Sequence, residues 1–244
     1  MQKVYVDYQP PWIQGWVDVT DSVSNLHLAR MATELKNLGE KKPSLSLYNS
    51  LLTRRIPKIV LTGGPCSGKS EIMKRVKREM GIDIHCVPEA ATIMISHLGI
   101  NPGTNPYRFN LTNYRIQKIF ETTSEAQAID EGKKAMLLDR GCPDNVAYME
   151  RGWNGFEEMC KTTKKFELNQ YPLVIYLEVP PKEIYEKSKA NNPARTESHI
   201  QAIFLGEKIK EMWGEHLNLH IVPNCERWEE KENIVIDIIK KFLA

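Results

Sequence analysis

The chain has 244 residues, enough for one sizeable α/β domain with an appendage but short for two full domains. A net charge of +2 argues against a general binder of polyanions, and the sequence carries no specific nucleic-acid signature. No apolar run approaches the roughly 20 residues of a membrane span, and the N-terminus lacks the apolar core of a signal peptide. The five cysteines are scattered, without a CxxC pair. We therefore expect a cytoplasmic protein without a transmembrane segment.

The N-terminal part of the chain differs in pattern from the rest. Residues that favour β-structure surround a Pro-Pro pair, and a stretch with apolar residues at helical spacing then ends on Gly39. A Lys-Lys-Pro sequence separates this stretch from a second, short helical pattern. We expect residues 1–56 to form an N-terminal extension of unknown role, and residues 57–244 to form one domain.

From Lys58 onward, short apolar strands alternate with helical patterns. The strands are expected at 58–63, 84–89, 136–139, 173–179 and 219–223. The helices are expected at 69–81, 90–99, 110–134, 197–216 and 226–243, with another beginning at 143. This alternation predicts a three-layer α/β domain, in which helices cover both faces of a five-stranded parallel sheet. Ligands of such a domain bind at the carboxyl ends of the strands.

The stretch LTGGPCSGKS, from Leu61 to Ser70, has the spacing of a phosphate-binding loop. A predicted strand precedes it and a predicted helix follows it, which is the context that this motif requires. Backbone N–H groups of such a loop, together with the start of the helix, bind anions. The residues expected to bind a nucleotide here are Gly63, Gly64, Pro65, Cys66, Ser67, Gly68, Lys69 and Ser70.

Three side chains of this loop have separate expected roles. Lys69 should reach the β- and γ-phosphates, and its head should be solvated when no nucleotide is bound. Ser70 should ligate Mg²⁺. Cys66 either fills space among small residues or is a reactive thiol with a lowered pKa near a helix N-terminus. The alternative to a nucleotide site is a glycine-rich turn without a ligand.

AMLLDRG places Asp139 at the carboxyl end of an apolar strand, where a P-loop protein needs a carboxylate to hold Mg²⁺. The neighbouring Arg140 would then face phosphate or an acidic substrate group. A surface Asp-Arg pair is the alternative. Asp144, four residues further on than Arg140, is either part of the same site or an N-terminal cap of the next helix.

Three more segments that follow strands or precede helices carry candidate side chains. Glu89 ends another strand and could accept a substrate proton, orient a water molecule or assist Mg²⁺, or simply be an acid at a helix N-terminus. Arg195 lies in a polar, turn-rich segment that could act as a lid, or could be an ordinary loop. Asn224 follows the last predicted strand and could hydrogen-bond the nucleotide base.

Together these segments resemble the P-loop family of AAA-type ATP/GTP-binding domains, which includes the translocation-defect protein and relatives of nicotinamide riboside kinase. The resemblance extends from about Lys58 to the C-terminus. It rests on VLTGGPCSGKS, VPEAATIMI, the long helix around Gln117, LLDRGCPDNVAY, ARTES, and MWGEH with VPN. It implies a fold similar to nucleoside and nucleotide kinases. Some relatives phosphorylate small molecules, whereas the translocation-defect type binds GTP and phosphoinositides.

Two functions remain open from the sequence. The first is a Mg²⁺-dependent phosphotransferase that uses ATP or GTP on a small hydroxylated, nucleoside-like acceptor. Its expected metal ligands are Ser70 and Asp139. Its expected catalytic residues are Lys69, Glu89, Asp139, Arg140 and Arg195.

The second function is a slowly hydrolysing, nucleotide-dependent binding module that acts on a protein or phosphoinositide partner. Its support is a group of aromatic residues in the N-terminal extension that could form a partner surface, although they could equally pack against the domain. These residues are Tyr5, Tyr8, Trp12, Trp16 and Tyr48.

Overall fold

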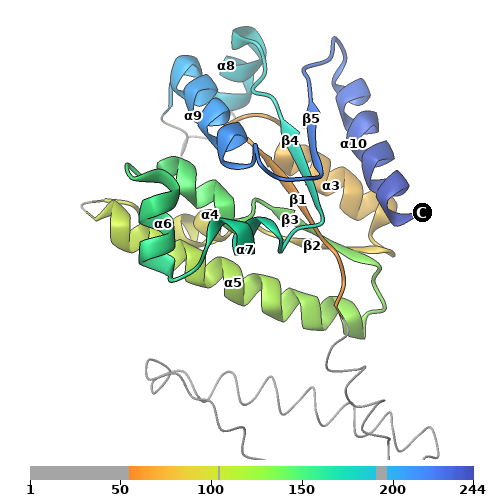
Figure 1. Cartoon of the computed structure of the whole chain (residues 1–244). Helices are drawn as coiled ribbons and strands as arrows, with labels where there is room; N and C mark the ends of the chain where they lie inside the picture. Colours follow the sequence, from red (N-terminus) through yellow and green to blue (C-terminus); the bar gives the residue numbers. More distant parts are fainter. Residues whose placement is uncertain (1–54, 104, 191–196) are drawn as a thin grey trace, which may run out of the picture. The chain divides into compact units, whose positions relative to one another are not determined.

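A computed structural model describes residues 55–103, 105–190 and 197–244 (Figure 1). Most of the predicted extension and Arg195 lie outside the described residues. Arg55 and Ile56, which the sequence assigned to the extension, contact the domain. Ile56 is buried in its core, and Arg55 pairs with Glu125 at 2.9 Å.

The five predicted strands form one parallel sheet in the order β2-β3-β1-β4-β5, which confirms the predicted fold class. The strands are β1 (Lys58–Gly63), β2 (Ile84–Val87), β3 (Ala135–Asp139), β4 (Leu173–Leu177) and β5 (Leu219–Val222). Because all strands run in one direction, their carboxyl ends meet at one edge. Asp139 ends β3 at that edge, and the phosphate loop and Glu89 follow the ends of β1 and β2 there.

The sheet separates two apolar layers, because alternate residues of a strand point to opposite faces. On one face Leu61 and Leu137 pack with α3 (Lys69–Met80) and α10 (Trp228–Leu243). On the other face Val60 and Leu138 pack with α5 (Pro106–Asp130) and α9 (His199–Met212). Figure 1 shows the two helical layers on either side of the strands. The result is the predicted three-layer domain.

The remaining helices are short and pack against α5, α9 or one another. They are α4 (Ala90–Ser96), the 3₁₀ helix η1 (Cys142–Tyr148), α6 (Gly152–Cys160), α7 (Lys164–Leu168) and α8 (Lys182–Ala190). In the described part of the chain, no helix combines the length and apolar character needed to cross a membrane.

Several helices differ from the sequence-based expectations, most clearly in the following respects. The long helix α5 begins at Pro106 rather than at residue 110, because Asn105 caps it by accepting a hydrogen bond from the backbone N–H of Arg108. The segment from residue 143 is a 3₁₀ helix rather than the start of an α-helix. Helices α6, α7 and α8 have no counterpart in the prediction, since they are only nine, five and nine residues long and their apolar periodicity is correspondingly short.

Candidate functional site

The phosphate loop joins the end of β1 to the start of α3 and depends on two glycines with positive φ. Gly63 has φ 143° and Gly68 has φ 97°, conformations that side chains with a Cβ rarely adopt. A Cβ on Gly63 would overlap the carbonyl of Leu177, and one on Gly68 would overlap the ring of Trp228. The loop therefore adopts the compact turn that the motif predicted, with Gly68 as the N-cap of α3.

Lys69 is buried, so the prediction of a solvated lysine head was wrong. Its Nζ donates to the carbonyl oxygens of Gly63 and Gly64, both at 3.0 Å, and to Ser67 Oγ at 3.3 Å. Burial, assisted by the positive charge of Arg140, lowers the pKa of Lys69 to about 8. An anion bound in the loop would raise the pKa of Lys69 again, since it would compensate the buried positive charge.

Cys66 has a left-handed backbone, with φ 59°, and its side chain is buried. It packs with Tyr185 of α8 and Ala202 of α9. Of the two sequence interpretations, the contacts fit a side chain that fills space between the loop and these two helices. Gly64 lies equally close to α9, because a Cβ there would meet the carbonyl of Ala202 and Cα of Gly206.

Asp139 ends β3 with a carboxylate oxygen that has no hydrogen-bond partner among the described residues. Its Oδ1 is shielded from solvent, which is costly for a charged group. Burial, together with the negative charge of Glu89, raises the pKa of Asp139 to about 6. The carboxylate is therefore available to a cation, and it gains stability when one binds.

The residues at this edge fit the requirements of Mg²⁺, which prefers oxygen ligands and usually binds through one or two carboxylates and substrate phosphates. Ser70 lies exposed in the first turn of α3, and Asp139 supplies the orphaned oxygen. Within the described ranges no group of three or more His, Cys, Asp or Glu residues is placed to hold a metal ion. A magnesium ion here would thus depend on the phosphates of a nucleotide for further ligands.

Arg140 follows Asp139 in a left-handed conformation, with φ 73°, which costs a non-glycine residue about 1–2 kcal/mol. Its Nε donates to Glu89 Oε1 at 2.5 Å. Its Nη1 donates to the carbonyl of Gly63 and to Asp144 Oδ1, both at 3.2 Å. The guanidinium thus connects two carboxylates to the phosphate loop, and a direct contact with phosphate remains a prediction.

Asp144 is buried and has the capping role that the sequence left open. Its Oδ2 accepts a hydrogen bond from the backbone N–H of Gly141 at 2.9 Å, at the start of η1. Its Oδ1 accepts from Thr62 Oγ1 and from Arg140. Asp144 therefore fixes η1 to the end of β1 and to Arg140.

Glu89 is the residue before α4, but its carboxylate bonds to side chains rather than to the helix backbone. Besides Arg140, Thr92 Oγ1 donates to Glu89 Oε2 at 2.6 Å. Burial by itself raises the pKa of Glu89, but the charges of Arg140 and Lys69 and the two hydrogen bonds lower it overall. The side chain is 25% exposed, so an ionised carboxylate faces solvent at the carboxyl edge.

Asn224 already has protein partners for both atoms of its amide. Nδ2 donates to the carbonyl of Val179 at 2.7 Å, and Oδ1 accepts from Lys231 Nζ at 3.0 Å. These bonds join the ends of β4 and β5 to α10, and contact with a base remains a prediction.

Sequence reasoning missed Trp228, which lies against Gly68 and is 42% exposed. Its place after the last strand, four residues from Asn224, is the only sequence signal that could have identified it.

A family model described as an AAA domain matches residues 58–231. The chain belongs to the AAA domain family. The match includes the phosphate loop, Glu89, Asp139, Arg140 and Asn224, and it supports nucleotide binding by this AAA domain. A search of curated proteins finds no match.

We predict that Asp139→Asn stabilises the nucleotide-free protein more at pH 8 than at pH 5. The folded-state pKa of Asp139 is raised, so its contribution to stability is complete below the unfolded-state pKa and is lost as the pH rises through about 6. Removing the charge should therefore increase the free energy of unfolding by on the order of 2 kcal/mol at pH 8. Urea unfolding at the two pH values measures this difference.

The same variant should lose the enhancement of ATP affinity by Mg²⁺. Asp83→Asn is the matched control, because Asp83 is a half-exposed aspartate just before β2, at the opposite edge of the sheet. Calorimetric titrations with ATP, in Mg²⁺ or in EDTA, compare the three proteins. An undiminished effect of Mg²⁺ in Asp139→Asn would remove Asp139 from the metal site.

Proposed function

We propose that this AAA domain is a Mg²⁺-dependent phosphotransferase that moves a phosphoryl group from ATP or GTP to a small hydroxylated, nucleoside-like acceptor. The observation that carries the proposal is the bridge from Glu89 through Arg140 to the carbonyl of Gly63. A single guanidinium joins an ionised, solvent-facing carboxylate to the phosphate loop. An acceptor hydroxyl bonded to Glu89 would therefore lie beside the terminal phosphate.

The electrostatics of the site suit phosphoryl transfer, which depends mainly on positioning and on the stabilisation of charge. Lys69 and Arg140 both bond to the carbonyl of Gly63, so two cations lie at the loop that we propose binds the phosphates. Asp139 and Ser70 would hold Mg²⁺, which neutralises charge on the bound phosphates. Glu89 is ionised at neutral pH, so it can orient the acceptor hydroxyl. Because its pKa is lowered it is a weak base, and it receives the proton only as the transfer proceeds.

A second candidate is the slowly hydrolysing module that binds a protein or phosphoinositide partner. One observation favours a protein partner: the exposed apolar side chains Ile200 and Phe204 lie on α9, which contacts the phosphate loop near Gly64. Binding of a nucleotide could then change the surface offered by α9. In this case turnover would be slow and independent of any acceptor.

The two functions are distinguished by ADP or GDP release in the presence of a panel of nucleosides and hydroxylated cofactor precursors. A phosphotransferase should release the diphosphate much faster with one acceptor of the panel, and the phosphorylated acceptor should be detectable by mass spectrometry. Slow release with every acceptor, combined with a partner affinity that depends on the bound nucleotide, would favour the module.

We predict that Glu89→Gln lowers acceptor-stimulated turnover by roughly 10²–10⁴-fold, the usual cost of losing a general base. The amide keeps the shape of the side chain but cannot receive the proton. Nucleotide affinity should change little, because the loop, Lys69 and Ser70 carry that binding. Steady-state rates and calorimetric titrations measure the two quantities separately.

Glu158→Gln, on an exposed surface of α6, is the control for the loss of one carboxylate. It should leave both turnover and affinity unchanged. Wild-type turnover by Glu89→Gln with a confirmed acceptor would show that Glu89 is structural.

A further inference from the structure

The backbone turn after β3, which carries Arg140, is held by side chains from two other parts of the chain. The carbonyl of Arg140 accepts a hydrogen bond from Gln117 Nε2 of α5 at 3.3 Å. The N–H of Cys142 donates to the hydroxyl of Tyr171 at 3.1 Å. Both side chains are buried. The left-handed conformation of Arg140 is thus supported from outside the turn.

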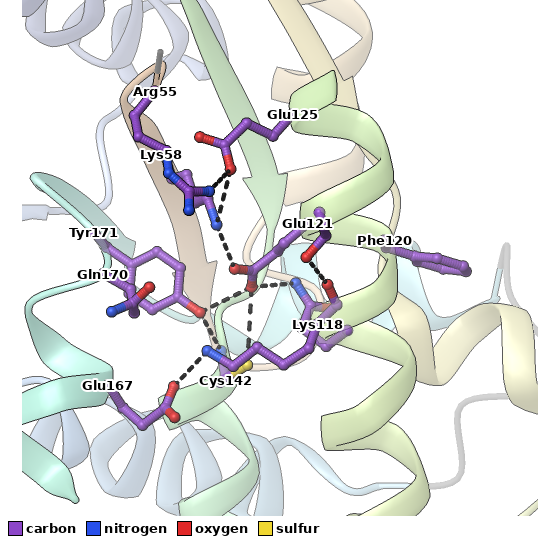
Figure 2. Close-up of polar contacts among 12 residues, drawn as sticks. Arg55, Lys58, Lys118, Phe120, Glu121, Glu125, Cys142, Glu167, Gln170 and Tyr171 are labelled. Carbon is purple, nitrogen blue, oxygen red and sulfur yellow. Dashed lines mark hydrogen bonds and ion pairs between the residues drawn. The ribbon is translucent and has the colours of Figure 1, made fainter. Parts of the chain in front are cut away.

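Glu121 is the acceptor that these two side chains share. Its Oε1 accepts from Gln117 Nε2 at 3.1 Å and from the hydroxyl of Tyr171 at 2.8 Å. Figure 2 shows Glu121, Tyr171 and Cys142 joined in this way. Burial raises the pKa of Tyr171 well above its usual value, so its hydroxyl stays protonated and can donate. The carboxylate therefore sets the direction of both donors.

The charge of Glu121 is balanced by a lysine from the first strand. Lys58 Nζ lies 3.3 Å from Glu121 Oε2 and 3.8 Å from Glu125 Oε2 (Figure 2). Glu121 is 1% exposed, and a carboxylate that is so deeply buried is tolerated only when it is paired and hydrogen-bonded. Lys58 thus supplies the countercharge to the carboxylate that accepts from both donors.

We propose that Glu121 is a positioning residue of the nucleotide site, which acts through Gln117 and Tyr171 to hold the turn that carries Arg140. Arg140 in turn holds Glu89 and contacts the carbonyl of Gly63. An effect of Glu121 on enzymatic turnover presupposes the proposed function, whereas its effect on the backbone turn at Arg140 does not.

Glu125 provides a matched control for a substitution of Glu121. It lies one helical turn further along α5, is also buried, and also faces Lys58. Its described partners are Lys58 and Arg55, and it makes no described contact with the turn. Glu121→Met and Glu125→Met thus remove equivalent carboxylates and preserve side-chain length and helix propensity. Only Glu121→Met removes the carboxylate that accepts hydrogen bonds from Gln117 and Tyr171.

The Nε–H of Arg140 provides a readout that does not require any enzymatic activity. In the wild type it donates to Glu89 at 2.5 Å from a largely buried guanidinium, so it should exchange slowly with water. Its ¹⁵N NMR signal is assigned as the one lost in Arg140→Lys. In Glu121→Met we expect this Nε–H to exchange about tenfold faster, the change that corresponds to losing the support of one buried hydrogen bond. Glu125→Met should leave the exchange rate as in the wild type, because Glu125 makes no described contact with the turn.

Tyr171→Phe tests the same contact should Glu121→Met fail to fold, because it removes only the hydroxyl between Glu121 and Cys142. It should also accelerate exchange at Arg140. An unchanged exchange rate of the Arg140 Nε–H in Glu121→Met overturns the inference. If Glu121→Met does not fold, an unchanged rate in Tyr171→Phe overturns it instead. An equal change in Glu125→Met overturns it too, because the effect would then come from the charge of the helix.

Turnover is measured on the same proteins and tests a different claim. Accelerated exchange at Arg140 with no acceptor-stimulated turnover, even in the wild type, would support the positioning role and contradict the phosphotransferase proposal. Slower turnover in Glu121→Met with an unchanged Arg140 signal would contradict the positioning role alone.

Discussion

The carbonyl oxygen of Gly63 accepts hydrogen bonds from two cations, Lys69 at 3.0 Å and Arg140 at 3.2 Å, and the rest of the site depends on this convergence. Two positive charges in a buried place repel each other, which is part of the reason for the lowered pKa of Lys69. Anions close by favour the charged form of Lys69 and offset the repulsion between the two cations. The protein supplies these anions from the ends of β2 and β3 and from η1.

The compensating groups are the carboxylates of Glu89, Asp139 and Asp144, which differ in how many of their oxygens have hydrogen-bond partners. Asp144 and Glu89 are hydrogen-bonded, whereas Asp139 keeps one oxygen without a partner and has a pKa of about 6. The negative charge that lacks a hydrogen-bond partner is thus on Asp139, the side chain that we propose as a ligand of Mg²⁺. A magnesium nucleotide would complete this balance, because its phosphates would pair with the cations and its metal with Asp139.

Much of the fold and part of the site could be predicted from the sequence, because the relevant signals are local. Each apolar strand and the spacing of Gly63, Gly68 and Lys69 can be recognised within a short window. The position of Asp139 follows from the end of its strand. The fine contacts are different, because they join residues that are far apart in the chain. The bond between Tyr171 and Glu121 spans 50 positions, and the contact of Trp228 with Gly68 depends on how α10 packs.

The burial of Lys69 shows the same limit, since a motif indicates which group binds phosphate but not what that group contacts without a ligand. The nucleotide affinity of Lys69→Ala, measured by calorimetric titration with Mg·ATP and Mg·GTP, tests the nucleotide site most directly. Charge-assisted hydrogen bonds are worth roughly 1.5–3 kcal/mol, so affinity for the preferred nucleotide should fall by at least about tenfold. Lys74→Ala, an exposed lysine of the same helix, should bind like the wild type. Wild-type affinity in a folded Lys69→Ala protein would contradict the assignment of the nucleotide site.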